Sequence, residues 1–107
     1  MSFPERVKKL VRQRSGGICE GCGTALATEF HHRKYKSRGG KDTTANCLHL
    51  CGWGNHTGCH GLAHSANPPE GWAVHSWDIP TIAPAALARG RVILHDDGTE
   101  ESGTAVF

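Results

Sequence analysis

Apolar positions near the start of the chain predict an amphipathic helix. They recur at three- and four-residue intervals, and basic residues fill most of the positions between them. Ser2 and Glu5 have the spacing of a capping box, and Pro4 falls in the first turn, where a missing N–H costs little. Because Gly16-Gly17 ends the pattern, the sequence predicts a helix over residues 2–15. Its apolar face consists of Phe3, Val7, Leu10 and Val11.

The middle of the chain predicts two strands and a second helix. Residues 28–33 and 47–50 have the character of short strands, and a polar, basic loop joins them. A glycine-rich loop then leads into a short helix from about Cys59 to Ala66, with Asn55 or Thr57 as its cap. The order strand, strand, helix is therefore expected over residues 28–66.

The pattern beyond residue 70 is weaker. Residues 72–75 and 91–95 predict short strands, and Asp97-Gly98 is a turn signal between strands. We expect residues 100–107 to be frayed, as chain ends often are. The whole pattern predicts an α+β fold with an N-terminal helix and a short β-containing C-terminal tail.

The amino-acid composition indicates that the protein binds metal ions. A chain of 107 residues is expected to form one domain, 1–107, but only 37% of it is hydrophobic, so its thin core needs a staple. Five cysteines and eight histidines supply metal ligands. The charged start lacks the apolar core of a signal peptide, and no apolar run approaches the roughly 20 residues that span a bilayer. We therefore expect a cytoplasmic protein without a membrane partner, whose cysteines bind metal instead of forming disulfides.

Four of the cysteines have the arrangement of a structural zinc site. Cys19 and Cys22 flank a tight turn, where both sulfur atoms can reach one metal ion. Cys51 and Cys59 can complete a tetrahedral four-cysteine site, with glycines between them that let the loop bulge out and return. Their separation is wider than the usual two to four residues, so the spacing alone leaves alternatives open.

The alternatives concern the remaining ligands and the role of the thiols. His56 or His60 can replace one cysteine, whereas Cys47 is interpreted as a small core residue. Buried free thiols are a further alternative, but four cysteines in two clusters of a small chain rarely serve packing alone. A redox function of the Cys19–Cys22 pair would need a βαβ context, which the pattern does not predict.

The charge distribution suggests nucleic acid as a partner. Residues 1–41 contain ten of the twelve Lys and Arg residues but only three acidic residues. A basic half is the electrostatic signature of nucleic-acid binding, although a solvated basic helix would have the same composition. The basic residues of the first helix are Arg6, Lys8, Lys9, Arg12 and Arg14. A second group, expected to contact DNA phosphates, is Arg33, Lys34, Lys36, Arg38 and Lys41.

Four histidines form a chemical pattern of their own. Adjacent residues of a strand point to opposite sides, so His31 and His32 cannot easily bind the same metal ion. His60 and His64 are four residues apart on the predicted helix, and therefore form a chelating pair on one face. One histidine of the adjacent pair is expected to face a metal and the other a water molecule, for which a neutral imidazole is a suitable general base.

These segments together resemble a known family. CEGC, FHHRKYKSRGG and NCLHLCGWGNHTGCHGLAH are similar to the motifs of HNH endonucleases of the ββα-metal superfamily, and most closely to the small ones of actinobacterial phages. The resemblance covers about residues 12–66, which it identifies as a ββα-metal core, and leaves 67–107 as a C-terminal extension. It implies that His31 is a metal ligand and His32 the general base. It also implies that His60, and in one branch of the family His64, binds the catalytic metal.

Asn46 corresponds to the middle residue of the HNH motif. The resemblance implies that its amide bridges the main chain across the loop or orients His32, and Asn46 thus joins His31, His32 and His60 in the expected catalytic set. A turn residue is the alternative interpretation. A metal-dependent DNA endonuclease is expected, with structural Zn²⁺ and one catalytic divalent ion (Mg²⁺, Mn²⁺, Ni²⁺, Co²⁺ or Zn²⁺).

Further partners depend on the source of the chain. A phage-encoded nuclease would act in the host cytoplasm and could work with terminase subunits, as a monomer or a homodimer. The alternative function is a non-catalytic zinc-ribbon module that binds DNA. Such a module has no need of the histidine set, which is the feature that distinguishes the two.

Overall fold

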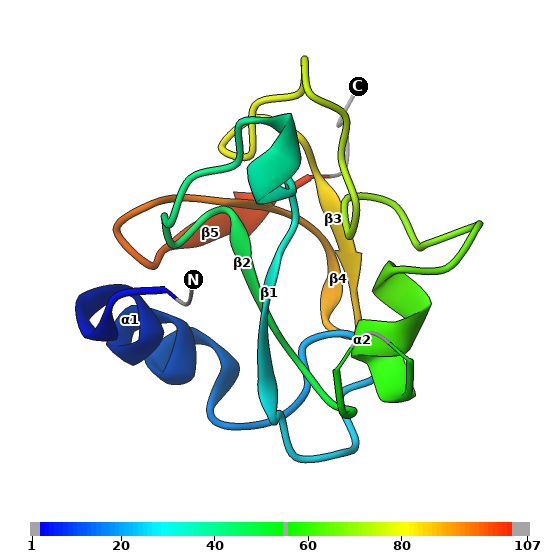
Figure 1. The fold of residues 1–107 in the computed structure, drawn as a ribbon. Helices are drawn as coiled ribbons and strands as arrows, with labels where there is room; N and C mark the ends of the chain where they lie inside the picture. Colours follow the sequence, from blue (N-terminus) through cyan, green and yellow to red (C-terminus); the bar gives the residue numbers. More distant parts are fainter. Residues whose placement is uncertain (1–2, 55, 104–107) are drawn as a thin grey trace.

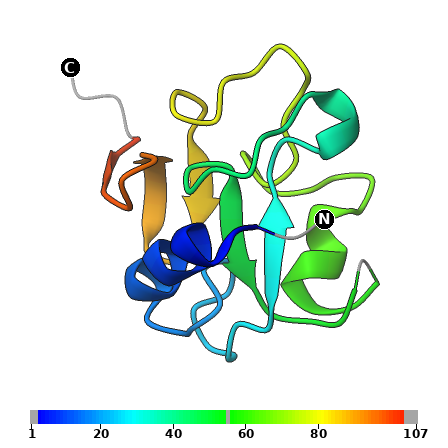
Figure 2. The same cartoon turned by 60° about the vertical axis from the view of Figure 1, so that its left-hand side comes forward.

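The N-terminal helix of the sequence prediction is confirmed, with a later start. A computed structural model describes residues 3–54 and 56–103 (Figures 1 and 2). Helix α1 spans Glu5–Ser15 and follows Pro4 in an extended conformation; Ser2, the expected cap, lies outside the described residues. Gly16 ends the helix in the left-handed region (φ 66°), and its N–H donates to the carbonyl of Arg12. Val7 and Val11 are buried, whereas Leu10 is only partly covered.

A two-stranded antiparallel hairpin lies at the centre of the molecule. Strand β1 (Glu29–His32) pairs with β2 (Cys47–Leu50), so that Glu29 faces Leu50 and His32 faces Cys47. The predicted bounds of β2 are confirmed, and β1 is one residue shorter at each end than predicted. The loop between the strands contains a short 3-10 helix, η1 (Lys36–Arg38).

The two faces of the hairpin have different neighbours. Cys47 and Phe30 pack with the apolar face of α1, whereas Leu48 and Leu50 belong to the larger core cluster on the other side. That larger cluster includes Ala63 of helix α2 (Gly58–Ala63), and Figure 1 shows α1 and α2 on opposite sides of the hairpin. Because strand side chains alternate between faces, His31 and His32 are directed toward different helices.

The second helix is shorter than predicted. It ends at Ala63, and Thr57 is its N-cap residue, as expected for one of two candidates. The Thr57 hydroxyl makes no side-chain cap bond to α2, but instead accepts from the N–H of Trp53 at 2.7 Å and so closes the preceding loop. Asn55, the other candidate, lies outside the described residues.

The C-terminal region forms a second sheet. Strands β3 (Ala85–Leu87), β4 (Gly90–Leu94) and β5 (Glu100–Ser102) pair antiparallel in that order. The strand predicted at 91–95 forms one residue earlier, as β4, and the turn predicted at 97–98 is confirmed, since it joins β4 to β5. The fraying expected for 100–107 is wrong for β5, and residues 104–107 lie outside the described part.

The strand predicted over 72–75 does not form. Its main-chain groups bond elsewhere: the Trp72 carbonyl accepts from His31, and the Val74 N–H donates to the Arg33 carbonyl. This segment therefore lies beside the end of β1, where it contacts the site described below. Within the described residues, no helix is long and apolar enough to cross a membrane.

A buried ion pair joins α1 to the rest of the molecule. The Arg14 guanidinium donates two hydrogen bonds to the carboxylate of Glu20, at 2.7 and 2.8 Å, and both side chains are almost fully buried. Arg89, from the turn between β3 and β4, donates to the same carboxylate. The expectation that Arg14 solvates the helix or grips phosphates is wrong, because its charge is used inside the protein.

Candidate functional site

Four cysteines meet beside the hairpin. The sulfur atoms of the four lie within 4.8 Å of one another, and these residues are Cys19, Cys22, Cys51 and Cys59. Main-chain N–H groups donate toward two of the sulfurs: Cys22 toward Cys19, and Cys59 toward Cys51. Such donors are typical of turns that hold metal-bound thiolates. The grouping is compatible with the structural zinc site predicted from the sequence.

The ionisation of these thiols also favours a bound cation. Burial and the neighbouring sulfurs of Cys19 and Cys51 raise the pKa of Cys59, and burial raises that of Cys19. The exposed Cys22 differs, because hydrogen bonds from Thr24 lower its pKa to about 6. Ionisation of Cys19 and Cys59 is therefore unfavourable without a compensating charge, which a zinc ion would supply.

The remaining cysteine is separate from this group. Cys47 is fully buried and packs with α1 on the opposite face of the hairpin, as its interpretation as a core residue predicts. Burial raises the pKa of its thiol far above the usual range. His60, an alternative zinc ligand, belongs instead to a second cluster.

That second cluster consists of three histidines. One nitrogen of each of His31, His60 and His64 lies within 4.8 Å of the others, and each pair of ring centroids is 5.0 Å apart. His31 comes from β1, His60 from α2, and His64 follows the last turn of α2. The structure thus brings together the three residues that the sequence proposed as ligands of a catalytic metal.

Hydrogen bonding prepares His31 to bind a metal ion. Its Nε2 lies 2.5 Å from the Trp72 carbonyl oxygen, which can only accept, so the proton is on Nε2 and the lone pair on Nδ1. Burial lowers the pKa of His31 to about 3, so the ring is neutral. A histidine ligand held by a carbonyl through its other nitrogen is the usual arrangement at metal sites.

The other two members of the cluster also fit a metal. The Nδ1 of His60 is buried and has no hydrogen-bond partner among the described residues, a costly state that a metal ion would relieve. Burial lowers the pKa of both His60 and His64. Three neutral imidazoles form a ligand set that suits first-row transition metals.

His32 lies on the other side of the strand but lines the same hollow. A cavity of about 270 Å³ opens between the hairpin and α2, and its lining includes His32 and the three clustered histidines. The His32 ring stacks on Phe3 at a centroid distance of 3.9 Å. Its Nε2 lies 2.8 Å from a carboxylate oxygen of Asp42, a residue that the sequence did not single out.

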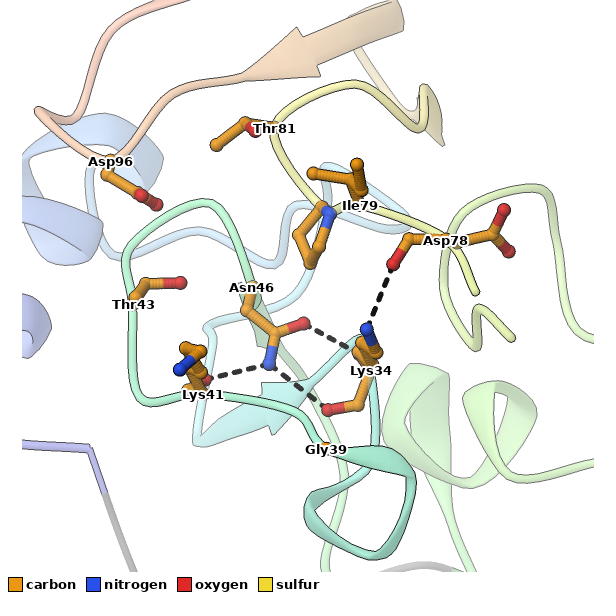
Figure 3. Close-up of a pocket in the computed structure, with 10 residues that line it drawn as sticks. Lys34, Gly39, Lys41, Thr43, Asn46, Asp78, Ile79, Thr81 and Asp96 are labelled. Carbon is orange, nitrogen blue, oxygen red and sulfur yellow. Dashed lines mark hydrogen bonds between the residues drawn. The ribbon is translucent and has the colours of Figure 1, made fainter. Parts of the chain in front are cut away.

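Asn46 bridges the main chain of the loop that follows β1. Its side-chain oxygen accepts from the Lys34 N–H at 2.7 Å, and its amide nitrogen donates to the carbonyls of Lys34 and Lys41 (Figure 3). All three bonds go to main-chain atoms, which agrees with the first of the two roles expected for this residue. The amide also borders a separate cavity of about 240 Å³ between this loop and Ile79.

One of the five basic residues expected to contact DNA is misassigned. Arg33 is fully buried, and its guanidinium donates to four main-chain carbonyls. It cannot reach a phosphate; it ties β1 to the loop before β2 and to the C-terminal segment. The four acceptors are Ala45, Gly71, Pro80 and Ala83.

The other four basic residues are accessible to different degrees. Lys36, Arg38 and Lys41 are exposed, and Lys34 is partly buried with its ammonium group donating to the Asp78 carbonyl. Lys36 lines the histidine-containing hollow and pairs with Asp42. The positive charge expected beside the catalytic pair is therefore present on this loop.

The protein has a small α+β fold. Its hairpin and the region of helix α2 together form a three-histidine site, and four cysteines cluster nearby. The chain is similar to part of the Type IV methyl-directed restriction enzyme EcoKMcrA of Escherichia coli (strain K12), with 39% identity over 74 residues. The match covers 60% of this chain and 25% of that enzyme, so the chain spans about a quarter of its relative's length. No family model and no solved structure matches the chain.

Proposed function

We propose that the protein is a metal-dependent DNA endonuclease of the HNH type. The observation that carries this proposal is the three-histidine cluster with His32 at the edge of the same hollow. This arrangement offers a metal site and a potential general base to one substrate. The similarity to a restriction enzyme supports a nuclease that acts on DNA.

The chemistry assigned to these residues is phosphodiester hydrolysis. His32 accepts a proton from a water molecule, whose oxygen attacks phosphorus while the bond to the leaving oxygen breaks. His31, His60 and His64 would hold the catalytic divalent ion, which when bound stabilises negative charge on the leaving oxygen. Asn46 keeps the loop after β1 in place, so that Lys36 remains beside the hollow.

The structural part of the proposal is a zinc ion on the four cysteines. A zinc ion at this position would hold the Cys19–Cys22 turn against the loop that leads into α2. Because His60 directly follows Cys59, the same ion would also fix the start of the helix that carries His60 and is followed by His64. The zinc site thus supports the catalytic site without entering the reaction.

The partners and the setting belong to the same proposal. Exposed Lys36, Arg38 and Lys41 would bind the DNA backbone without reading its sequence. A small phage-type HNH nuclease, formed by the single domain 1–107 and active as a monomer or homodimer in the host cytoplasm, fits the motifs. Terminase subunits are the protein partners proposed for a phage-encoded enzyme.

A zinc-ribbon module that only binds DNA is the competing function. The four cysteines and the basic loop suit both functions, but a binding module leaves the neutral histidine cluster without a purpose. Incubation of supercoiled plasmid with the zinc-loaded protein and added Mn²⁺ or Ni²⁺ tests the choice. The endonuclease produces nicked or linear DNA, and a chelator stops the reaction; DNA binding without any metal-stimulated cleavage would favour the module.

A further inference from the structure

We infer that Asp42 is a positioning residue that holds His32 in the orientation and tautomer needed for proton abstraction, an inference that rests on the proposed nuclease function. A carboxylate oxygen of Asp42 lies 2.8 Å from Nε2 of His32. Asp42 belongs to the loop between β1 and β2, ten residues after His32. The pair is therefore produced by the fold of this loop.

The hydrogen bond assigns different tasks to the two ring nitrogens. Hydrogen bonds from His32 and Lys36 keep the pKa of Asp42 below its usual value, so the carboxylate is ionised and can only accept. The proton of a neutral His32 ring is therefore on Nε2, which leaves the lone pair on Nδ1. Proton abstraction from water is consequently assigned to Nδ1, and a carboxylate behind the ring stabilises the imidazolium that forms.

Two further contacts restrict movement of this pair. The ring of Phe3 stacks on His32 with an interplanar angle of 16°, which limits tilting of the imidazole. The ammonium group of Lys36 lies 3.1 Å from both oxygens of Asp42, which limits rotation of the carboxylate. Phe3 thus holds the face of the His32 ring, and Asp42 holds its Nε2 edge.

The adjacent histidines are oriented by different partners on opposite faces of the strand. His31 donates from Nε2 to the Trp72 carbonyl, whereas His32 donates from Nε2 to Asp42. A carbonyl is a neutral acceptor, which suits a metal ligand that never takes up a proton. A carboxylate suits a residue that becomes positively charged during each reaction. The two histidines are thus held by acceptors of different charge, each compatible with the role proposed for its histidine.

The inference is tested with Asp42→Ala, Asp42→Glu and the matched control Asp97→Asn in the β4–β5 turn. Metal-saturated Asp42→Ala is expected to lose about ten- to a hundredfold in kcat for plasmid nicking, with KM for DNA and affinity for the catalytic metal unchanged. Asp42→Glu should recover part of the loss, and Asp97→Asn should match wild type. Addition of Asp42→Ala to His32→Ala should cause no further loss, because the two residues act as one unit.

Nitrogen NMR of the imidazole rings supplies a readout besides activity. In the wild type, His32 should show the tautomer protonated at Nε2, and in Asp42→Ala a mixture of both tautomers. Unchanged kcat, an unchanged tautomer, or a loss of metal affinity in place of kcat would overturn the assignment of Asp42. Absence of nicking by the wild type itself is a different result, which would overturn the proposed nuclease.

Discussion

The imidazole of His31 and the main-chain carbonyl of Trp72 are joined by a 2.5 Å hydrogen bond that links β1 to the C-terminal segment. Trp72 is itself held from two sides: its indole N–H donates to the Ala86 carbonyl, and its ring lies against Gly21 of the cysteine turn. One tryptophan thus contacts the turn between Cys19 and Cys22, the second sheet and a member of the three-histidine cluster. The proposed zinc and catalytic sites are therefore mechanically connected.

Gly21→Ala tests this connection without changing any metal ligand. A Cβ at position 21 would overlap Cη2 and Cζ2 of the Trp72 ring, so we expect a loss of about 1–3 kcal/mol in the free energy of unfolding. Weaker binding of the catalytic metal should accompany it, as calorimetric titration can show. Trp72→Phe removes the two overlapping atoms, so the double variant should be more tolerant of the added methyl group; equal destabilisation in both backgrounds would contradict the connection.

Arg33 is predicted to be a stability residue, not a DNA contact. Arg33→Met leaves buried carbonyls without a donor, each of which costs about 1–3 kcal/mol, so a total loss of about 3–5 kcal/mol is expected in urea unfolding. The matched control is Arg91→Met, whose guanidinium pairs with Glu70 at the surface and should hardly change the unfolding midpoint. If Arg33→Met had unchanged stability but bound DNA more weakly, Arg33 would be a DNA contact, as the sequence suggested.

One zinc ion per chain is predicted to survive purification. Because metal binding and folding are coupled at such sites, Cys22→Ser should lose the zinc and much of the structure of the hairpin region. Cys47→Ala is the control, since this buried cysteine lies outside the four-sulfur group and should retain the metal. Elemental analysis and circular dichroism measure both properties. Normal folding of zinc-free Cys22→Ser would show that the cysteines are not a structural staple.

The choice of catalytic metal follows from the ligands. Imidazole binds transition metals better than Mg²⁺, so Ni²⁺, Mn²⁺ or Co²⁺ should support nicking at least as well as Mg²⁺. The comparison uses zinc-loaded protein at equal concentrations of each added metal, so that the structural site is held constant. Strict dependence on Mg²⁺ would show that a carboxylate- or water-rich site has been overlooked.

The sequence predicted the elements that carry strong local signals. The bounds of β2 are confirmed, and Gly16 ends α1 as a glycine at a helix C-terminus should. Strand β3 was missed because two of its three residues are alanines, which have little strand preference; it forms through pairing with β4. Residues 72–75 have a strand-like pattern, but their main-chain groups are used by His31 and Arg33.

The candidate site shows the same limits. The four-residue spacing of His60 and His64 predicted that they cluster, and they do, although the helix ends at Ala63, before His64. Burial of Arg33, in contrast, cannot be distinguished from exposure in a run of basic residues. Asp42 was missed because its contact with His32, ten residues earlier in the sequence, depends on the path of the loop between β1 and β2. The role of Trp72 rests on a main-chain carbonyl, a group that every residue carries and that no sequence pattern identifies.

The most direct test of the account is calorimetric metal titration of His31→Ala and His32→Ala, each also assayed for plasmid nicking. His32→Ala should bind the catalytic metal and DNA like wild type but lose about a hundred- to ten-thousandfold in cleavage, the usual contribution of a positioned general base. His31→Ala should bind the metal weakly, and excess metal should restore part of its activity. Equal loss of metal affinity in both variants, or full activity of His32→Ala, would contradict the division of labour on which the proposed nuclease depends.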